Sequence, residues 1–334
     1  MASCSFVRGV AATIAACGCA VASAGPTVDP ADVARRDAAL LDRVRRAREA
    51  LEWTDEVVRH DWRLQRRPGT DECRVLDPDE RIVCAGTGDS CRRELARLCS
   101  AGRVPGVRGP TVILLHGLGE GRGSMRPLAA ALRGSLDATV MTFGYASVKA
   151  DIDAHARALG AVVADLPAAA RVHFVGHSLG NLVVRRWMAV APAADLGRVG
   201  RMVMLGPPNQ GADMARMAAK IWGVAARAEG AARDLVVDWE TVAPGLAVPP
   251  CEFGIVAGGR GDDVGFSPLL AGDDDAVVRV AETRLDGAAD FLVVPVHHAS
   301  MMDHADVQRA TAAFLQDGRF PARSAEPAGT GEPR

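Results

Sequence analysis

The stretch that decides the fold is Arg171–Gly180, which reads RVHFVGHSLG. Its first half is a short apolar run typical of a buried strand, and an apolar helical stretch, Leu179–Val190, follows it. Gly176, Ser178 and Gly180 have the spacing of a sharp strand-to-helix turn. Such a turn exposes the serine oxygen, and the helix N-terminus below it stabilises negative charge. We therefore expect Ser178 to be a nucleophile.

Short apolar runs alternate with helical stretches from Thr111 onward. This alternation predicts an α/β fold in which helices flank both faces of a mostly parallel sheet. We assign 110–320 to this catalytic domain and 321–334, rich in Pro, Gly, Ala and Glu, to a disordered tail. The expected strands are 112–115, 138–143, 171–175, 201–205, 253–257 and 291–294. The expected helices are Met125–Arg133, Val148–Leu166, Leu179–Val190 and Met214–Arg227.

A second glycine-rich segment, His116–Gly119 (HGLG), directly follows the first of these strands. A loop of small residues at this position lets backbone amides approach a substrate carbonyl. The amides of Leu118 and of Leu179, which follows the expected nucleophile, are our candidates for an oxyanion hole. His116 precedes the nucleophile, so we expect it to hold the loop by hydrogen bonding and not to be the catalytic base.

These two motifs, together with Leu205–Gly211 (LGPPNQG), resemble the α/β-hydrolase lipases and esterases. The resemblance covers about Thr111 to Phe320. It implies the α/β-hydrolase fold, a Ser-Asp-His triad, hydrolysis of small-molecule or lipid esters through an acyl-enzyme, and no cofactor or metal. It also implies that His177, inside the elbow, lines the substrate pocket. A thioesterase, an acyltransferase or an amidase is an alternative on the same triad, and so is a catalytically silent binding domain.

The acid of such a triad follows the nucleophile, and the base comes last. The segment Gly272–Val278 (GDDDAVV) fits the acid loop. Similar lipases carry Asp-Gly-x-Val there, which aligns Asp275 with the acid and places Ala276 where glycine is usual. Asp273 and Asp274 compete with Asp275 for this role.

Two adjacent histidines, His297 and His298, follow the last expected strand and compete for the role of base. Alignment with the family favours His298. His304 falls on the following helical stretch and His173 lies in a strand, so neither is preferred.

The first residues predict export. Arg8 supplies a positive charge, Val10–Val21 is apolar, and Ala22–Ala24 (ASA) fits a cleavage site, so we assign 1–24 to a signal peptide. In a rival interpretation Ile14–Cys17 (IAAC) resembles a lipobox. It would place a lipid on Cys17 and associate the protein with a membrane surface. In both cases we expect a periplasmic or secreted protein.

Residues 25–109 form the expected N-terminal extension and linker. Asp29–His60 is charged, with apolar residues at helical spacing, which predicts a helix. Four cysteines then crowd together, as is typical of disulfides in an oxidising compartment. A zinc site is the competing interpretation, disfavoured because the segment has no Cys-x-x-Cys pair and no histidine among the cysteines.

Cys73 and Cys84 bracket a predicted hairpin that would set them opposite each other. Cys91 and Cys99 lie on one helical pattern, about 12 Å apart by helix geometry. This is too far for a bond between them. Cys251 is left over.

Charge gives no reason to expect nucleic acid as a partner, since 39 basic and 41 acidic residues leave a net charge of -2. With 49% hydrophobic residues the chain can bury a substantial core.

Overall fold

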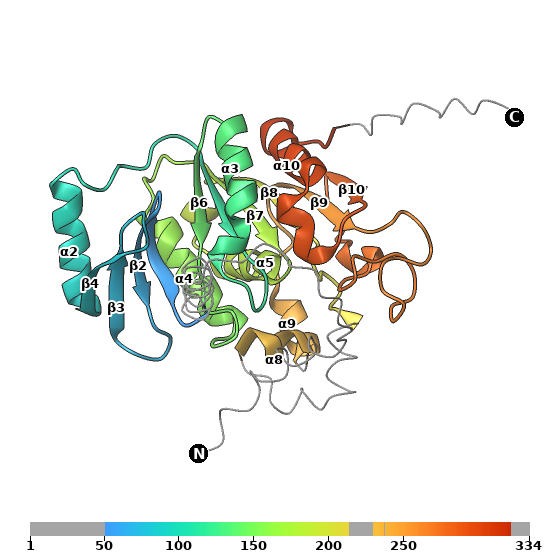
Figure 1. The fold of residues 1–334 in the computed structure, drawn as a ribbon, viewed down its shortest axis with the longest axis horizontal. Helices are drawn as coiled ribbons and strands as arrows, with labels where there is room; N and C mark the ends of the chain where they lie inside the picture. The colour runs from blue at the N-terminus through green and yellow to red at the C-terminus, as the bar shows by residue number, and fades with distance from the viewer. Residues whose placement is uncertain (1–50, 214–229, 237, 322–334) are drawn as a thin grey trace, which may run out of the picture. The chain divides into compact units, whose positions relative to one another are not determined.

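The computed structural model describes residues 51–213, 230–236 and 238–321 (Figure 1). Their centre is a six-stranded sheet in the order β10-β9-β8-β7-β5-β6, and every neighbouring pair is parallel. All six expected strands are confirmed, with ends that differ by at most two residues. They are β5 (Thr111–Leu115), β6 (Thr139–Phe143), β7 (Val172–His177), β8 (Val199–Leu205), β9 (Glu252–Gly258) and β10 (Asp290–Val294).

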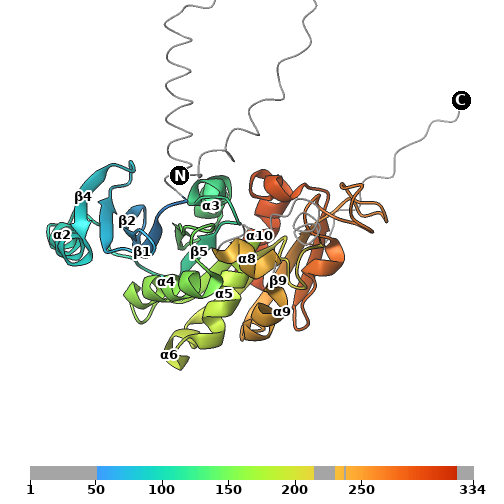
Figure 2. The same ribbon diagram turned by 90° about the horizontal axis from the view of Figure 1, so that it is seen from below.

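Helices cover both faces of this sheet (Figure 2). Successive residues of β5 point to opposite sides of the sheet. Val112 and Leu114 join the core beneath α3 (Arg126–Ser135) and α10 (Ala305–Asp317), whereas Ile113 and Leu115 join the core beneath α4 (Ile152–Asp165) and α5 (Leu179–Val190). Strands buried on both faces are expected to be continuously apolar, as these are. The other elements of this domain are η1 (Arg122–Met125), α4 (Ile152–Asp165), α5 (Leu179–Val190), α6 (Ala193–Leu196), α8 (Gly230–Val236), α9 (Trp239–Val242), η3 (Ala243–Gly245), η4 (Val280–Thr283) and η5 (His298–Asp303).

The expected helices 125–133, 148–166 and 179–190 are confirmed, and α4 begins four residues later than predicted. Its start is set by Asp151, whose carboxylate accepts a hydrogen bond from the amide of Ala154 at 2.7 Å. The expected helix 214–227, the signal peptide with Cys17, and residues 322–334 of the tail lie outside the described residues. No helix in the described ranges has the length and apolar character needed to cross a membrane.

The described part of the N-terminal extension is mainly strand, not helix. It contains β1 (Thr54–Arg59), β2 (Trp62–Arg66), β3 (Glu72–Leu76) and β4 (Ile82–Thr87) in one antiparallel sheet, followed by α2 (Gly88–Ser100). The prediction of a helix reaching His60 is therefore wrong over β1. Threonine and valine there are β-branched and favour strands. His60 has φ 56°, which turns the chain directly into β2.

The predicted hairpin of β3 and β4 is confirmed, but its cysteines do not face each other. Cys84 pairs with Val75, and Cys73 pairs with Gly86, because the register is two residues away from the expected one. Cys91 and Cys99 share α2, as expected. The five cysteines of the described residues are free thiols, so the expected disulfides are absent from these positions; Cys84 and Cys91 approach to 3.6 Å between their sulfur atoms.

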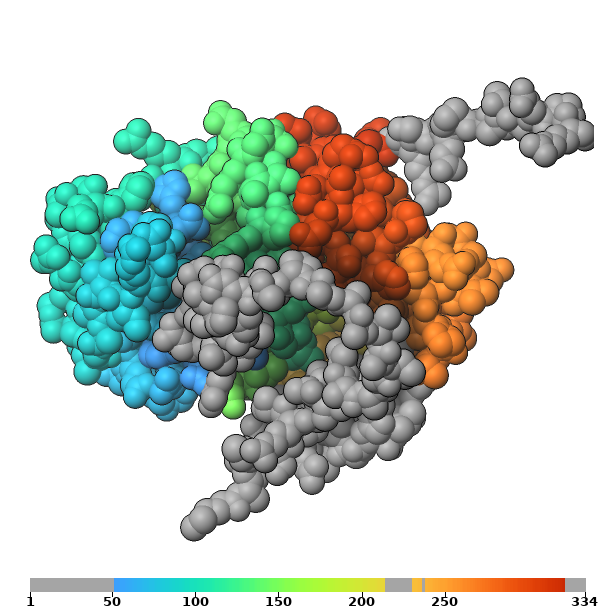
Figure 3. All heavy atoms as spheres, viewed as in Figure 1, coloured from blue at the N-terminus to red at the C-terminus, as the bar shows by residue number. Residues whose placement is uncertain are grey.

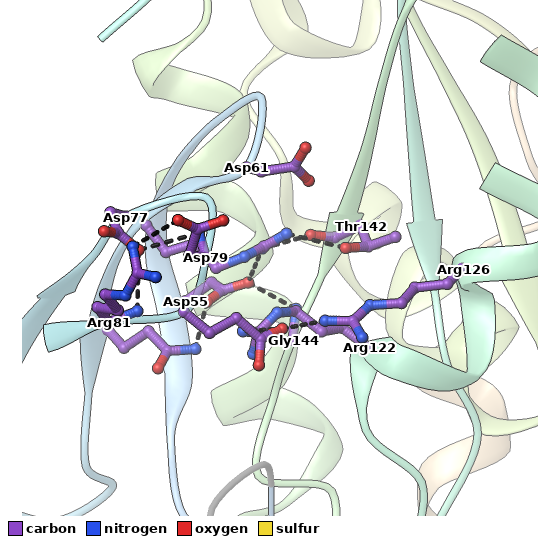
Figure 4. A network of polar contacts seen from close by, with 12 residues as sticks. Asp55, Asp61, Asp77, Asp79, Arg81, Arg122, Arg126, Thr142 and Gly144 are labelled. Atoms are coloured by element: carbon purple, nitrogen blue, oxygen red, sulfur yellow. Dashed lines mark hydrogen bonds and ion pairs between the residues drawn. The ribbon is translucent and has the colours of Figure 1, made fainter. Parts of the chain in front are cut away.

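The N-terminal sheet is attached to the central sheet through a buried polar network around Asp55 (Figure 4). One carboxylate oxygen of Asp55 accepts from Arg63 and from the amide of Gly144, both at 2.7 Å. The other accepts from Gln65 at 2.8 Å. Arg63 also donates to the carbonyl and the hydroxyl of Thr142, at the end of β6. Every donor in this network has an acceptor, which is what makes a buried charge tolerable.

Asp55→Asn should lower the free energy of unfolding by about 3–5 kcal/mol, because the buried Arg63 guanidinium loses its counter-charge. Urea unfolding followed by circular dichroism would measure this. The matched control is Asp61→Asn: Asp61 is half exposed, with Arg133 at 3.3 Å, and its loss should cost under about 1 kcal/mol. Equal effects of the two substitutions would show that the network does not anchor the sheet.

Candidate active site

Ser178 lies at the sharp turn between β7 and α5, with φ 50° and ψ -121°. This left-handed conformation is strained for a non-glycine residue. The turn needs glycine on both sides: a Cβ on Gly176 would lie 2.4 Å from the side chain of Asn181, and one on Gly180 would lie 2.6 Å from the carbonyl of Leu115. The elbow predicted from the sequence is therefore present, and it holds Ser178 at the carboxyl end of the central strand.

The expected acid and base meet in a buried pair. Nδ1 of His298 donates to Oδ2 of Asp275 at 2.6 Å, and the amide of His298 donates to the Asp275 carbonyl at 2.8 Å. The other carboxylate oxygen of Asp275 accepts from the amides of Val277 and Val278 at 3.0 and 2.7 Å. With Asp275 fully buried and His298 8% exposed, these bonds fix both the ring orientation and its Nδ1–H tautomer.

The competing residues are placed elsewhere. Asp273 accepts from the amides of Arg260 and Gly261 and closes a loop. Asp274 accepts from the amides of Ser267 and Ala276. His297 is exposed, and its ring packs against Phe266 at a tilt of 38°, with 4.0 Å between ring centroids. The structure thus brings Asp275 and His298 together and leaves the three alternatives outside the pair.

Gly206 shows how tightly the nucleophile turn and this pair approach each other. The amide of Ser178 donates to the carbonyl of Leu205 at 2.9 Å, and Gly206 comes next in the chain. Gly206 has φ 50°, and a Cβ there would lie 3.0 Å from Nδ1 of His298 and 3.2 Å from Oδ2 of Asp275. The glycine therefore allows the end of β8 to lie against the acid–base pair.

The predicted structural role of His116 is confirmed by its contacts. Its Nδ1 donates to the Gly117 carbonyl at 2.9 Å, and its Nε2 accepts from the amide of Tyr145 at 3.3 Å. The Tyr145 ring stacks on it at 4.2 Å, and the Tyr145 hydroxyl donates to the His116 carbonyl at 2.5 Å. Burial lowers the pKa of His116 to about 4, so the ring is neutral at physiological pH.

Two residues that hold the predicted oxyanion loop were missed by sequence reasoning. Ser147 accepts from the amide of Gly119 at 3.1 Å, and Glu120 accepts from the amide of Gly117 at 3.1 Å. The amide of Leu118 lies between these two anchored amides, and Leu179 begins α5 directly after Ser178. Glu120 could have been found from its position in the sequence, because it directly follows the glycine loop His116–Gly119. Ser147 lies 28 residues away from Gly119, and local sequence carries no signal for that contact.

His177 is fully buried, with one ring nitrogen 3.3 Å from Glu120 Oε2 and the other 3.1 Å from the His298 carbonyl. Its expected contact with substrate stays a prediction. Burial raises the pKa of Glu120, but hydrogen bonds from His177, the amide of Gly117 and the hydroxyl of Ser124 outweigh it and lower that pKa to about 2. Among the described residues no His, Cys, Asp and Glu side chains gather as metal ligands would.

Solved structures with a similar fold include a lipase of Bacillus licheniformis, BlEst2, in its mature form. It has 16% sequence identity and a TM-score of 0.51, with 64% of this chain and 94% of the lipase aligned. The propeptide form of BlEst2 gives 16% identity and a TM-score of 0.50, with 67% and 54% aligned. No protein-family model and no protein of curated function matches the sequence. With the strand order and the serine elbow, this similarity confirms that the chain has the α/β-hydrolase fold.

Ala276→Gly should raise the free energy of unfolding by about 1 kcal/mol. Ala276 has φ 80°, a conformation that costs an L-residue with a side chain about 1–2 kcal/mol, and glycine relieves it. Denaturant unfolding would measure the gain. Ala161→Gly, an exposed position within α4, is the matched control and should lose about 1 kcal/mol. A loss at both positions would contradict the strain at Ala276.

Acid should remove the stability that Glu120 contributes. A carboxylate whose folded-state pKa is depressed from 4.5 to about 2 stabilises the fold above pH 4.5, and this contribution is lost as the pH falls toward 2. By linkage the loss is about 3 kcal/mol. Unfolding of the wild type and of Glu120→Gln should be compared from neutral pH downward. The gap between them should close over that range, and a constant gap would contradict the depressed pKa.

Proposed function

Given the α/β-hydrolase fold, we propose that this protein is a serine-dependent carboxylic-ester hydrolase, lipase- or esterase-like, with Ser178, His298 and Asp275 as its triad. The observation that carries the proposal is the buried 2.6 Å hydrogen bond between His298 and Asp275. This pair lies against Gly206, the residue that follows Leu205, whose carbonyl is hydrogen-bonded to the strained Ser178. A strained serine persists only where its surroundings over-determine it, and such strain clusters at active sites. This favours an enzyme over a silent binding domain.

In the proposed reaction, His298 removes the Ser178 proton through Nε2 while its Nδ1 remains bonded to Asp275. Ser178 Oγ attacks the ester carbonyl, and Asp275 stabilises the imidazolium that forms. The amides of Leu118 and Leu179 donate to the oxyanion of the tetrahedral intermediate, each lowering the barrier by about 3 kcal/mol. His298 then protonates the leaving alcohol, and water activated by the same histidine releases the acid from the acyl-enzyme.

The proposed substrates are small-molecule or lipid esters. The same triad would also serve a thioesterase, an acyltransferase or an amidase, because these reactions share the acyl-enzyme and differ in the leaving group or acceptor. The proposal includes export through the predicted signal peptide 1–24, or attachment to a membrane surface at Cys17. It requires no cofactor and no metal.

The purified mature chain should hydrolyse p-nitrophenyl esters, and Ser178→Ala should abolish this activity because the attacking oxygen is removed. Esters from acetate to palmitate would separate a short-chain esterase from a lipase. Labelling of the wild type, but not of Ser178→Ala, by a fluorophosphonate probe would identify the nucleophile independently. A folded wild type that neither turns over esters nor reacts with the probe would overturn the proposal.

Asp275→Asn tests the acid separately and belongs in the same assay. It should lower kcat by roughly 10⁴-fold, since an amide cannot hold the required histidine tautomer. Asp273→Asn is the matched control, because the Asp273 carboxylate accepts from the loop amides of Arg260 and Gly261, and it should retain activity within about 2-fold.

A further inference from the structure

The hydrogen bonds of two histidines, the buried His116 and the half-buried His173, show that their rings are neutral. Nε2 of His116 accepts from the amide of Tyr145, and Nδ1 of His173 accepts from the amide of Arg201 at 3.0 Å. A nitrogen that accepts carries no proton, so each ring holds one N–H. Burial, the largest cause in both, lowers the pKa of each ring to about 4. Both rings are therefore neutral at physiological pH.

His177 differs from these two because both of its ring nitrogens face oxygens. Nδ1 lies 3.3 Å from a carboxylate oxygen of Glu120, and Nε2 lies 3.1 Å from the backbone carbonyl of His298. A backbone carbonyl and an ionised carboxylate can only accept hydrogen bonds. A neutral ring has a single N–H, so one of these contacts would then set a lone pair against an oxygen in a fully buried place.

Glu120 is the partner that would otherwise have to carry a proton. Its Oε2 faces three groups: the Ser124 hydroxyl at 2.8 Å, the Gly117 amide at 3.1 Å and Nδ1 of His177. The Gly117 amide, which can only donate, and the Ser124 hydroxyl favour the carboxylate over the acid at Glu120. The proton therefore belongs on His177.

We propose that His177 is a doubly protonated imidazolium, paired with Glu120, and that this ion pair is a positioning device that ties the oxyanion loop to the segment carrying His298. His177 is a positioning residue here, because its contacts are with the loop and the backbone of the base. The kinetic consequence rests on the hydrolase function proposed above, whereas the protonation state does not.

The contacts of the ion pair show what it holds in place. On one side Glu120 fixes the amide of Gly117, where a Cβ would lie 3.1 Å from Nδ1 of His177. On the other side the His177 ring is tilted by 43° against the ring of His298, with 4.6 Å between centroids, and donates to its carbonyl. Within the described part of the chain, the charged or titratable groups in contact with His177 are Glu120 and His298, and His298 is bonded in turn to Asp275. The position of the base and the position of the oxyanion donors are thus set by one pair, in which His177 is buried and Glu120 is half-buried.

Nitrogen NMR on the ¹⁵N-histidine-labelled wild-type protein tests the protonation state, because imidazolium and neutral rings have different ¹⁵N shifts and numbers of ring N–H. The His177 signals are those lost in His177→Gln. At about pH 7.5 we expect two ring protons on His177 and one each on His116 and His173 as internal references. In Glu120→Gln, His177 should lose one ring proton. A single ring proton on wild-type His177 would overturn the proposal, whatever the activity.

Kinetics test the positioning role. Glu120→Gln should lower kcat on p-nitrophenyl acetate by about 10–100-fold. Its KM should stay within about 2-fold, because the pair orients reacting groups and does not bind substrate. Glu94→Gln, which loses an exposed pair with Arg97 on α2, should leave both constants unchanged. Full kcat in Glu120→Gln would overturn the positioning role. A wild type that is inactive and unlabelled by the probe would instead contradict the hydrolase proposal, and the NMR result would still decide the charge of His177.

Discussion

The steric constraint at Ser178 is what the rest of the site depends on. A left-handed serine between a strand and a helix is held only if both backbones approach it more closely than side chains allow, and Gly176 and Gly180 permit this approach. The strain is balanced by packing, because β7 is central in the sheet and its apolar residues are buried in both cores. A glycine is also needed at the end of the neighbouring strand β8, because His298 and Asp275 lie against the backbone of Gly206 and leave little room for a side chain.

The N-terminal sheet is part of the support of this site. Asp55 binds the backbone of Gly144 through both its amide and its carboxylate, and the next residue, Tyr145, stacks on His116 and bonds to its carbonyl. Ser147, two residues later, holds the amide of Gly119. A continuous set of contacts thus leads from the buried Asp55 network, drawn in Figure 4 as far as Gly144, to the oxyanion loop. In the space-filling view the extension, in blue and cyan, lies beside the green part of the chain (Figure 3). The sequence of the extension suggested no function, but its contacts support the oxyanion loop of the proposed active site.

Polar contacts at the site form two groups that share the residue His298, one fully buried and one with the half-buried Glu120 at its end. Its ring is bonded to Asp275, and its backbone carbonyl accepts from His177, which faces Glu120. Removing one member of a buried pair leaves the other desolvated without compensation, so both pairs make the local geometry sensitive to single substitutions. Ala276 adds backbone strain next to Asp275, at a position where glycine would be relaxed.

Sequence alone determined the alternating strands and helices of the central domain, the serine elbow and the glycine loop, because these depend on local periodicity and on residues that admit special backbone angles. It did not determine the N-terminal fold: the helical spacing of apolar residues extended as far as Val57, and pairing with β2 made Val57 part of a strand. The register of β3 and β4, which moved Cys84 opposite Val75, is likewise a tertiary outcome. The tertiary structure also separated Asp275 and His298 from the candidates next to them in sequence. Adjacent residues of the same type differ in the direction of their side chains, and that direction is set by the fold. Ser147 became visible only in the structure, because its contact with Gly119 joins segments 28 residues apart and leaves no local pattern in the sequence.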